Sequence, residues 1–164
     1  MKADGPQSED GEVRLDRFDR AMLKILAGDG RISVTDLARR VGLSKSPVQT
    51  RLRRLERAGV VRGYRAMVDP VRLGLQHVAF VEVRLTDTRE AALTAFNAAV
   101  ARVPEIEECH MIAGAFDYLL KVRTTDMTAY RAILGSAISA LPHVSHTSTY
   151  VAMQAVKETG VAPG

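Results

Sequence analysis

The densest group of side chains able to recognise another molecule lies between residues 31 and 65, where ten residues are basic and two are acidic. A local excess of cations this large fits a polyanionic partner. Glutamine can pair bidentately with adenine, arginine or lysine can pair with guanine, and guanidinium groups also bind phosphate. We therefore expect non-covalent recognition of double-stranded DNA, carried by Ser33, Ser44, Lys45, Ser46, Gln49, Thr50, Arg53, Arg54, Arg57, Arg62 and Arg65.

The reactive side chains elsewhere do not form a set that could catalyse a reaction. Cys109 and His110 are neighbours on an expected strand, so their side chains point to opposite faces and form no nucleophile–base pair. Asp117 has no visible catalytic partner, and His143 and His146 straddle a strand start instead of sharing a helix face. The sequence also lacks a phosphate loop and a dinucleotide fingerprint. We expect no catalytic residue, no metal and no cofactor, and hence no enzyme.

Two short helices are expected ahead of the most basic stretch. Apolar residues recur at helical spacing after Asp16, which can cap the helix, and the pattern ends at Gly28. A second helix is expected from Ser33, because Ser33-Val34-Thr35-Asp36 matches the Ser-x-x-acid capping pattern. Gly42 closes this second helix.

A third helix and a hairpin are expected to position the basic side chains themselves. The helix is expected within residues 44–58, with Ser46 as its cap and Pro47 at its first position. Two short β-like runs, residues 60–62 and 64–68, would form a wing. These elements predict a winged helix-turn-helix, whose second helix lies in the DNA major groove. A merely solvated basic scaffold, or a winged helix used for protein contacts, is the alternative interpretation.

The second half of the chain has a different pattern, which predicts an α+β fold. Strands are expected over residues 78–85, 106–112, 116–123 and 144–156. Between them, apolar spacing predicts one helix over residues 93–103 and another, capped by Asp126, over residues 127–141. The order βαββαβ is the ferredoxin-like arrangement.

The open face of this expected sheet needs a cover, because the two helices cover only one face. The strands carry apolar or amphipathic residues on both faces, which would leave a large exposed patch. We therefore expect dimerisation through the sheet, which also suits palindromic DNA sites. The residues concerned are Phe80, Val81, Val83, Met111, Ile112, Leu119, Leu120, Val122, Tyr150, Val151 and Met153.

Length and composition fix the expected organisation. The chain has 164 residues and one cysteine, so no internal disulfide can form, and no apolar run approaches the length of a membrane helix. We expect a cytoplasmic protein that does not associate with membranes. Its expected parts are a disordered leader (1–14), the winged helix-turn-helix (15–70), a linker (71–76), a sensing and oligomerisation domain (77–157) and a tail (158–164).

Over residues 15–157 the sequence resembles the Lrp/AsnC family, the feast/famine transcription regulators, and is most similar to the leucine-responsive members. The stretch Ala113-Gly114-Ala115-Phe116-Asp117-Tyr118 and the run of residues 151–158 resemble the members that regulate proline dehydrogenase genes. The other matching stretches are Leu15-Asp16-Arg17-Phe18-Asp19, Asp29-Gly30-Arg31-Ile32-Ser33, Arg40-Val41-Gly42-Leu43-Ser44, Arg51-Leu52-Arg53-Arg54-Leu55-Glu56, Glu108-Cys109-His110, Phe116-Asp117-Tyr118-Leu119-Leu120-Lys121, Asp126-Met127-Thr128-Ala129-Tyr130-Arg131 and Thr149-Tyr150-Val151.

The resemblance implies an amino-acid-sensing RAM domain in the second half, with leucine or proline as the effector. It also implies dimers that assemble into octamers or other rings, bind DNA and associate with the nucleoid. Ala115 and residues 45–50 depart from the pattern common in the family, and these departures bear on the effector and the operator respectively. The implied effector-binding residues are Met111, Gly114, Phe116, Asp117, Tyr118, Met127, Thr147, Thr149, Tyr150, Val151 and Ala152.

Two other functions share part of this pattern. An architectural DNA-organising protein of the same family would carry the same basic face with little sequence preference, so specificity rather than affinity separates the two. A small enzyme in the second half, with the first half as a docking module, would require turnover by residues 75–164.

Overall fold

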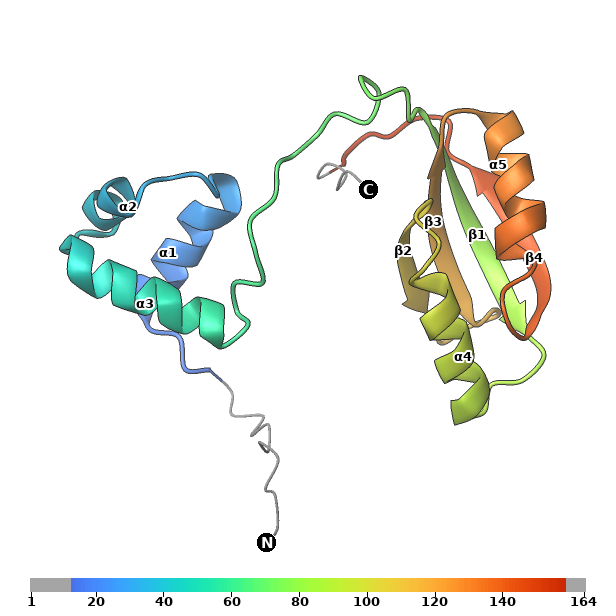
Figure 1. The fold of residues 1–164 in the computed structure, drawn as a ribbon, viewed down its shortest axis with the longest axis horizontal. Helices are drawn as coiled ribbons and strands as arrows, with labels where there is room; N and C mark the ends of the chain where they lie inside the picture. The colour runs from blue at the N-terminus through green and yellow to red at the C-terminus, as the bar shows by residue number, and fades with distance from the viewer. Residues whose placement is uncertain (1–12, 159–164) are drawn as a thin grey trace, which may run out of the picture. The chain divides into compact units, whose positions relative to one another are not determined.

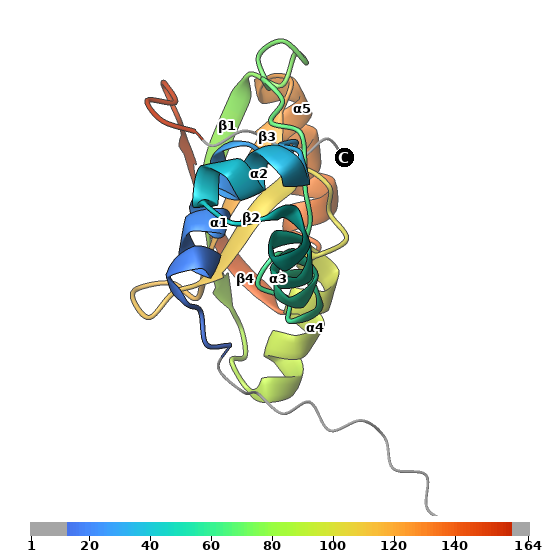
Figure 2. The same cartoon turned by 90° about the vertical axis from the view of Figure 1, so that its left-hand side faces the viewer.

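The computed structural model describes residues 13–158. The chain divides into two compact units, Met1–Ala66 and Met67–Gly164, which we call the N-terminal and C-terminal units (Figures 1 and 2). The expected leader (1–14) and tail (158–164) fall almost wholly outside the described residues. No helix among residues 13–158 is long and apolar enough to cross a membrane.

The N-terminal unit contains the helices α1 (Arg17–Gly28), α2 (Val34–Val41) and α3 (Lys45–Arg57). The Asp16 side chain caps α1 by accepting from the N–H groups of Phe18 at 2.8 Å and Asp19 at 2.9 Å. Ser33 caps α2, accepting from the N–H of Asp36 at 3.0 Å. Both predicted caps are confirmed, and each satisfies helix N–H groups that have no partner within the helix.

A small apolar core holds these helices together. Met22 of α1, Leu37 of α2, and Val48 and Leu55 of α3 are each at most 1% exposed. Gly42 adopts a left-handed φ of 74° at the end of α2, which turns the chain into α3. The predicted helix-turn-helix is therefore present, with its buried and outer faces as expected.

The start of α3 differs from the expectation. The helix begins at Lys45 with Ser44 in the cap position, so Ser46 is not the cap. Pro47 stands at the third helical position instead of the first. Proline is tolerated there because the first N–H groups of any helix have no partner within that helix.

The expected hairpin over residues 60–62 and 64–68 is not formed, since residues 60–67 belong to no strand. A two-stranded hairpin is only marginally stable unless other strands or a helix support it. Tyr64 instead turns back onto the helical unit, where its hydroxyl donates to Glu56 Oε1 at 2.9 Å.

The C-terminal unit confirms the βαββαβ prediction. The sheet is antiparallel with strand order β2-β3-β1-β4, and both helices pack on one face of it (Figure 1). The last helix continues into a π-helical turn, Leu134–Ile138. In chain order the elements are β1 (His77–Leu85), α4 (Glu90–Val100), β2 (Ile106–Met111), β3 (Tyr118–Thr124), α5 (Met127–Ile133) and β4 (Val144–Val151).

The core of this unit lies between the helices and the sheet. Val81, Leu120 and Val122 from the strands, Phe96 from α4 and Ile138 from the π-helical turn are all 0% exposed. Burying such side chains stabilises the fold by about 1.5–3 kcal/mol each. The helix-facing side of the sheet therefore accounts for most of the apolar strand residues.

The open face of the sheet is more polar than predicted. Successive strand residues alternate between faces, so Val81, Val83, Leu120 and Val122 point to the helices. The apolar residues left on the open face include Phe80 (37% exposed) and its cross-strand partner Tyr150 (55% exposed). They share this face with Glu82, Arg84, Leu119, Lys121, Arg123 and Ser148.

Two strand ends also differ from the expectation. β3 begins at Tyr118 instead of residue 116; just before it, the Asp117 N–H donates to Val83 of β1 and the Asp117 carbonyl accepts from the Ile112 N–H, which closes the β2–β3 turn. β4 ends at Val151, five residues before the expected end. Its partner strand β1 begins at His77, and the Ala152 N–H already donates to the Val78 carbonyl, so β1 offers almost no further length to pair with. Farther along, Glu158 pairs with Arg123 of the open face at 2.6 Å.

Candidate DNA-binding face and effector site

The outer face of α3 carries a set of free hydrogen-bonding side chains. Val48 and Leu55 bury the opposite side of the helix. None of the outer side chains makes a hydrogen bond or ion pair with another residue among 13–158. Their donors and acceptors are thus available to an external partner. The exposed residues are Lys45, Ser46, Gln49, Thr50, Arg53 and Arg57.

The hydroxyls of the two serines predicted to contact DNA differ in their hydrogen bonding. The Ser33 hydroxyl is engaged, because it accepts from the Asp36 N–H and donates to Asp36 Oδ2 at 2.7 Å. Ser44 holds the cap position of α3, yet its exposed side chain makes no cap hydrogen bond. Ser44 and the free N–H groups of the first turn therefore offer donors at the positive end of the α3 dipole, where an anion is favoured.

Arg62 and Arg65 are exposed on the segment that follows α3. Tyr64, between them, ties this segment to α3 through Glu56. Burial and the hydrogen bond to Glu56 raise the pKa of Tyr64 to about 12, so its hydroxyl remains a donor at neutral pH. This contact holds the two arginines near the end of α3.

Two other arginines of α3 are bound to carboxylates of α1. Arg51 Nη1 donates to Asp16 Oδ2 at 2.6 Å and to Asp19 Oδ1 at 3.0 Å, and Arg54 Nη2 donates to Asp19 Oδ2 at 2.5 Å. Burial alone would raise the pKa of Asp19, but its hydrogen bonds from Arg54, the Asp16 N–H and Arg51 lower it to about 2. We call these four residues the clasp. No sequence pattern marks Asp16 and Asp19 as partners of α3.

The sequence-predicted effector residues of the β2–β3 turn form the first of two groups. The Asp117 carboxylate accepts from the Leu85 N–H at 2.7 Å, and the Asp117 backbone bonds to Val83 and Ile112. The turn is therefore held against the end of β1. Met111, just before it, is 57% exposed. The other predicted residues here are Gly114, Phe116 and Tyr118.

The second group lies at the other end of the sheet. Val151 pairs with Ala79, whereas Tyr118 pairs with Val83, four residues farther along β1. That separation corresponds to about 13 Å. Thr147, which also pairs with Val83, lies level with the first group on the other side of β1. Thr149 is bonded to Tyr130, with its Oγ1 2.5 Å from the tyrosine hydroxyl oxygen. One protomer therefore does not gather the predicted residues into one site; the second group comprises Met127, Thr149, Tyr150, Val151 and Ala152.

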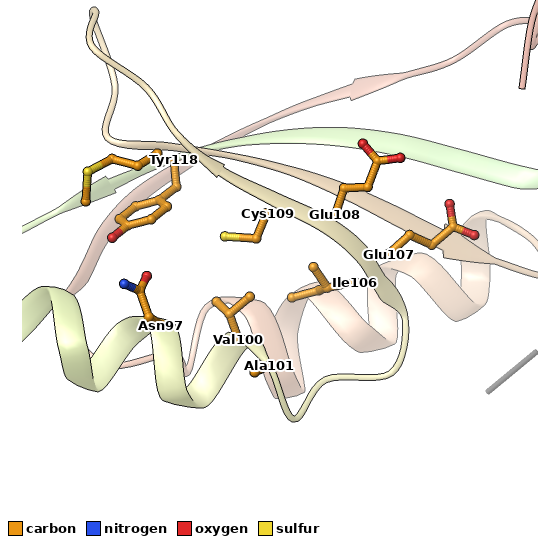
Figure 3. Close-up of a pocket in the computed structure, with 9 residues that line it drawn as sticks. Asn97, Val100, Ala101, Ile106, Glu107, Glu108, Cys109 and Tyr118 are labelled. Atoms are coloured by element: carbon orange, nitrogen blue, oxygen red, sulfur yellow. The ribbon is translucent and has the colours of Figure 1, made fainter. Parts of the chain in front are cut away.

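A pocket of about 480 Å³ lies between α4 and the edge strand β2 (Figure 3). Of the predicted effector residues, it is lined by Met111 and Tyr118. The Tyr118 hydroxyl is buried and has no hydrogen-bond partner among the described residues. Asn97 and Cys109 also face the pocket, and no sequence motif marks Asn97.

The remaining reactive side chains show no catalytic or metal-binding arrangement in the described residues. Cys109 pairs with Leu120 and His110 with Leu119, so the two neighbours face opposite sides of the sheet. Burial raises the pKa of the Cys109 thiol, which disfavours a reactive thiolate. Within residues 13–158 no three His, Cys, Asp or Glu side chains converge to hold a metal ion.

Comparison with known families gives the same division of the chain. Residues 15–62 match a winged helix-turn-helix DNA-binding family, and residues 78–162 match the Lrp/AsnC ligand binding domain. The chain belongs to the Lrp/AsnC family. It is thus a transcription regulator with a DNA-binding and a ligand-binding domain, and its family is not one of enzymes.

Curated relatives match this Lrp/AsnC chain over nearly its whole length. It is 60% identical to the proline dehydrogenase transcriptional activator of Rhizobium radiobacter over 147 residues, covering 90% of this chain and 94% of that protein. It is 48% identical to the leucine-responsive regulatory protein of Salmonella typhimurium over 145 residues, covering 88% of each chain.

Solved structures share the fold of the family member described here. The complex of a Neisseria meningitidis transcriptional regulator with L-Met has a TM-score of 0.82 at 33% identity, covering 92% of this chain and 97% of that one. An AsnC family transcriptional regulator from Agrobacterium tumefaciens has a TM-score of 0.83 at 35% identity, covering 91% and 97%.

Proposed function

We propose that this Lrp/AsnC protein binds specific DNA sequences through the outer face of α3 and that an amino acid modulates this binding. The observation that carries the proposal is the free polar face of the second helix of a helix-turn-helix. Such a helix enters the major groove with its N-terminal residues on base edges. The residues that read bases are Lys45, Ser46, Gln49 and Thr50.

The arginines set the affinity for DNA of any sequence. Arg53 and Arg57 are exposed and unpaired among residues 13–158, and Arg62 and Arg65 extend the cationic surface beyond α3. These four contact phosphates, which position the protein but carry no sequence information. Ser44 contacts the DNA backbone near the start of α3, whereas the Ser33 hydroxyl is held by Asp36. Arg54, which is held by Asp19, contributes less to phosphate binding than the four free arginines.

A dimer formed through the open face of the sheet supplies the two-fold symmetry of the DNA site. Phe80 and Tyr150 form the exposed apolar centre of that face, and Lys121 and Arg123 form its charged side. Dimers assemble further into octamers or other rings. Such an assembly works on the nucleoid in the cytoplasm.

The amino-acid effector binds where two protomers meet. The two groups of effector residues lie about 13 Å apart along β1, too far for one amino acid to contact both groups within one protomer. The Asp117 turn of one protomer therefore faces the β4 end of another. The Asp117 carboxylate would receive the ammonium group of the effector. Solved relatives of Neisseria meningitidis and Mycobacterium tuberculosis are complexes with L-methionine, which supports an amino-acid ligand.

Proline is the leading effector and a proline dehydrogenase gene the leading target, with leucine as the second candidate effector. Support comes from the 60% identity to two proline dehydrogenase transcriptional activators, against 48% to leucine-responsive regulatory proteins. A regulator of proline breakdown that senses proline would couple enzyme supply to its substrate.

A mobility-shift assay tests the DNA-binding part of this proposal. The probe is the DNA upstream of the proline dehydrogenase gene of the organism that encodes the chain, with a scrambled duplex of the same composition as control. We expect tight, salt-sensitive binding to the first and much weaker binding to the second. Equal binding of both duplexes would contradict sequence specificity.

A thermal-shift screen of the twenty amino acids tests the sensing part. A ligand present at about 100 times its Kd adds about 2.7 kcal/mol to the free energy of unfolding. We expect proline or leucine to raise the melting temperature of the wild type but not that of Asp117→Asn. The asparagine keeps an oxygen that can accept from the Leu85 N–H, so the turn itself should stay in place. A melting temperature that none of the twenty amino acids changes would contradict the sensing role.

A further inference from the structure

The clasp contains a fully buried carboxylate. Asp19 is 0% exposed, and its oxygens accept from the Asp16 N–H at 3.0 Å, from Arg51 at 3.0 Å and from Arg54 at 2.5 Å. An ionised carboxylate inside a protein is costly unless its charge is matched and its lone pairs are bonded. The packing of α1 against α3 therefore depends on both arginines reaching Asp19.

Both arginines belong to α3, and their positions fix the rotation of that helix. Arg51 and Arg54 are three residues apart, so they project from the same side of α3. Arg51 also donates to Asp16 at 2.6 Å, which ties α3 to the first turn of α1 at a second point. A roll of α3 about its axis would leave a buried charge without its partner, which is strongly unfavourable.

The clasped side of α3 adjoins the side proposed to read bases. Asp16, Arg51 and Arg54 line an open hollow of about 550 Å³ together with Ser46 and Thr50. The Asp16 carboxylate is 47% exposed in this hollow and disfavours a phosphate there. A rotation of α3 away from the clasp would move Thr50 and its neighbours off the base edges.

We propose that Asp19 is a positioning residue for DNA sequence recognition: it holds α3 at the rotation in which Gln49 and Thr50 face the bases, and it restrains Arg54 from binding phosphate. This inference rests on the proposed function. It implies two opposite effects when the Asp19 charge is lost. The released Arg54 strengthens binding to DNA of any sequence, while the loosened helix weakens binding to the preferred sequence.

The test compares Asp19→Asn with the wild-type full chain on two duplexes. One duplex is the sequence that the wild type enriches from a random pool, and the other is its scrambled counterpart; fluorescence anisotropy measures both affinities over a salt series. We expect the preference for the selected duplex to fall about tenfold, the effect of losing one good base contact. Affinity for the scrambled duplex should rise, and the slope of its salt dependence should steepen by about 0.9, the contribution of the one released arginine, Arg54.

Two further variants separate positioning from general effects. Asp69→Asn removes the same charge from an exposed pair with Arg72, whose atoms are 3.5 Å apart and lie outside the helix-turn-helix, so it should leave the sequence preference unchanged. Arg51→Lys keeps the net charge but cannot reach both carboxylates in the same way. We expect it to reduce the preference without changing binding to the scrambled duplex.

Different outcomes would overturn the positioning role of Asp19 and the proposed function. An equal loss of affinity for both duplexes in folded Asp19→Asn, or an unchanged preference, would overturn the positioning role. If circular dichroism shows that Asp19→Asn does not fold, Arg51→Lys carries the test, and an unchanged preference in that variant overturns the inference. A random pool from which the wild type enriches no sequence would overturn the proposed function, and the inference with it.

Discussion

At the scale of single residues, the charges of α3 have two different environments. Arg53 and Arg57 are exposed and free of partners in the described part of the chain, whereas Arg51 and Arg54 are bound to Asp16 and Asp19. A guanidinium held by a buried carboxylate contributes less to phosphate binding than a free one. The clasp thus divides a uniformly basic helix into a structural side and a DNA-binding side.

The buried carboxylate makes stability depend on pH. The pKa of Asp19 is lowered from 3.8 to about 2 in the folded protein, so the carboxylate stabilises the fold above pH about 4 and loses this contribution as the pH falls towards 2. We expect wild type to exceed Asp19→Asn in unfolding free energy by a margin that shrinks by about 2 kcal/mol over this range. Urea unfolding at a series of pH values measures this difference in stability. A difference that does not change with pH would contradict the lowered pKa of Asp19.

The residue types of the DNA-binding face could be predicted from the sequence, but their partners could not. Alternation of apolar and polar residues at helical spacing separates Val48 from Gln49 without any structure. Arg54 and Arg53 look alike in the sequence, because the carboxylate that distinguishes them lies 35 residues before Arg54. The effector residues came from the family resemblance, and only the sheet register divides them into two groups.

At the scale of the elements, capping decides where the helices of the N-terminal unit begin. Ser33 makes its cap hydrogen bond at 3.0 Å, whereas Ser44 occupies the same position on α3 and makes none. The two serines therefore differ in what their hydroxyls do. One stabilises α2, and the other remains available at the start of the DNA-reading helix.

Replacing each serine by alanine separates these roles. Ser33→Ala should lower the free energy of unfolding by about 1 kcal/mol, because an N–H of α2 loses its cap. Ser44→Ala should leave stability within about 0.5 kcal/mol of wild type and should weaken DNA binding. Urea unfolding followed by circular dichroism checks the first effect and anisotropy the second. An equal loss of stability in both variants would contradict the difference in capping.

Element order was predictable because hydrophobic periodicity and helix caps are local properties. The errors have local as well as long-range causes. Pro47 suggested a start for α3, but Ser44 takes the cap position and proline is accommodated in the first turn. Residues 60–67 have strand-like composition but no strand to pair with among the described residues. No local pattern predicts the π-helical turn Leu134–Ile138, whose first and last residues pack in the core.

At the scale of the whole molecule, the open face of the sheet is the surface that we expect to join two protomers. Phe80 and Tyr150 lie opposite each other on β1 and β4 and are both exposed. On the β3 side of this apolar pair, charged side chains are paired with one another, as in the contact of Arg123 with Glu158. Exposed aromatic side chains beside polar groups are typical of protein interfaces.

A charge at the centre of this face should disrupt the dimer. Phe80→Asp would place an unpaired carboxylate in an apolar contact, so light scattering after size exclusion should show a lower molar mass than for wild type. Thr88→Asp, in the exposed turn after β1, adds the same charge away from the face and should keep the wild-type mass. An unchanged mass for Phe80→Asp would place the interface elsewhere.

The most direct test of the central claim is the ratio of affinities for the selected and the scrambled duplex at one fixed salt concentration. We predict a ratio of at least about a thousand for the wild type. Gln49→Ala should reduce it about tenfold without changing scrambled binding, and Gln76→Ala, in the C-terminal unit, should leave it unchanged. A ratio near one for the wild type, or the same ratio for Gln49→Ala, would contradict sequence recognition by the outer face of α3.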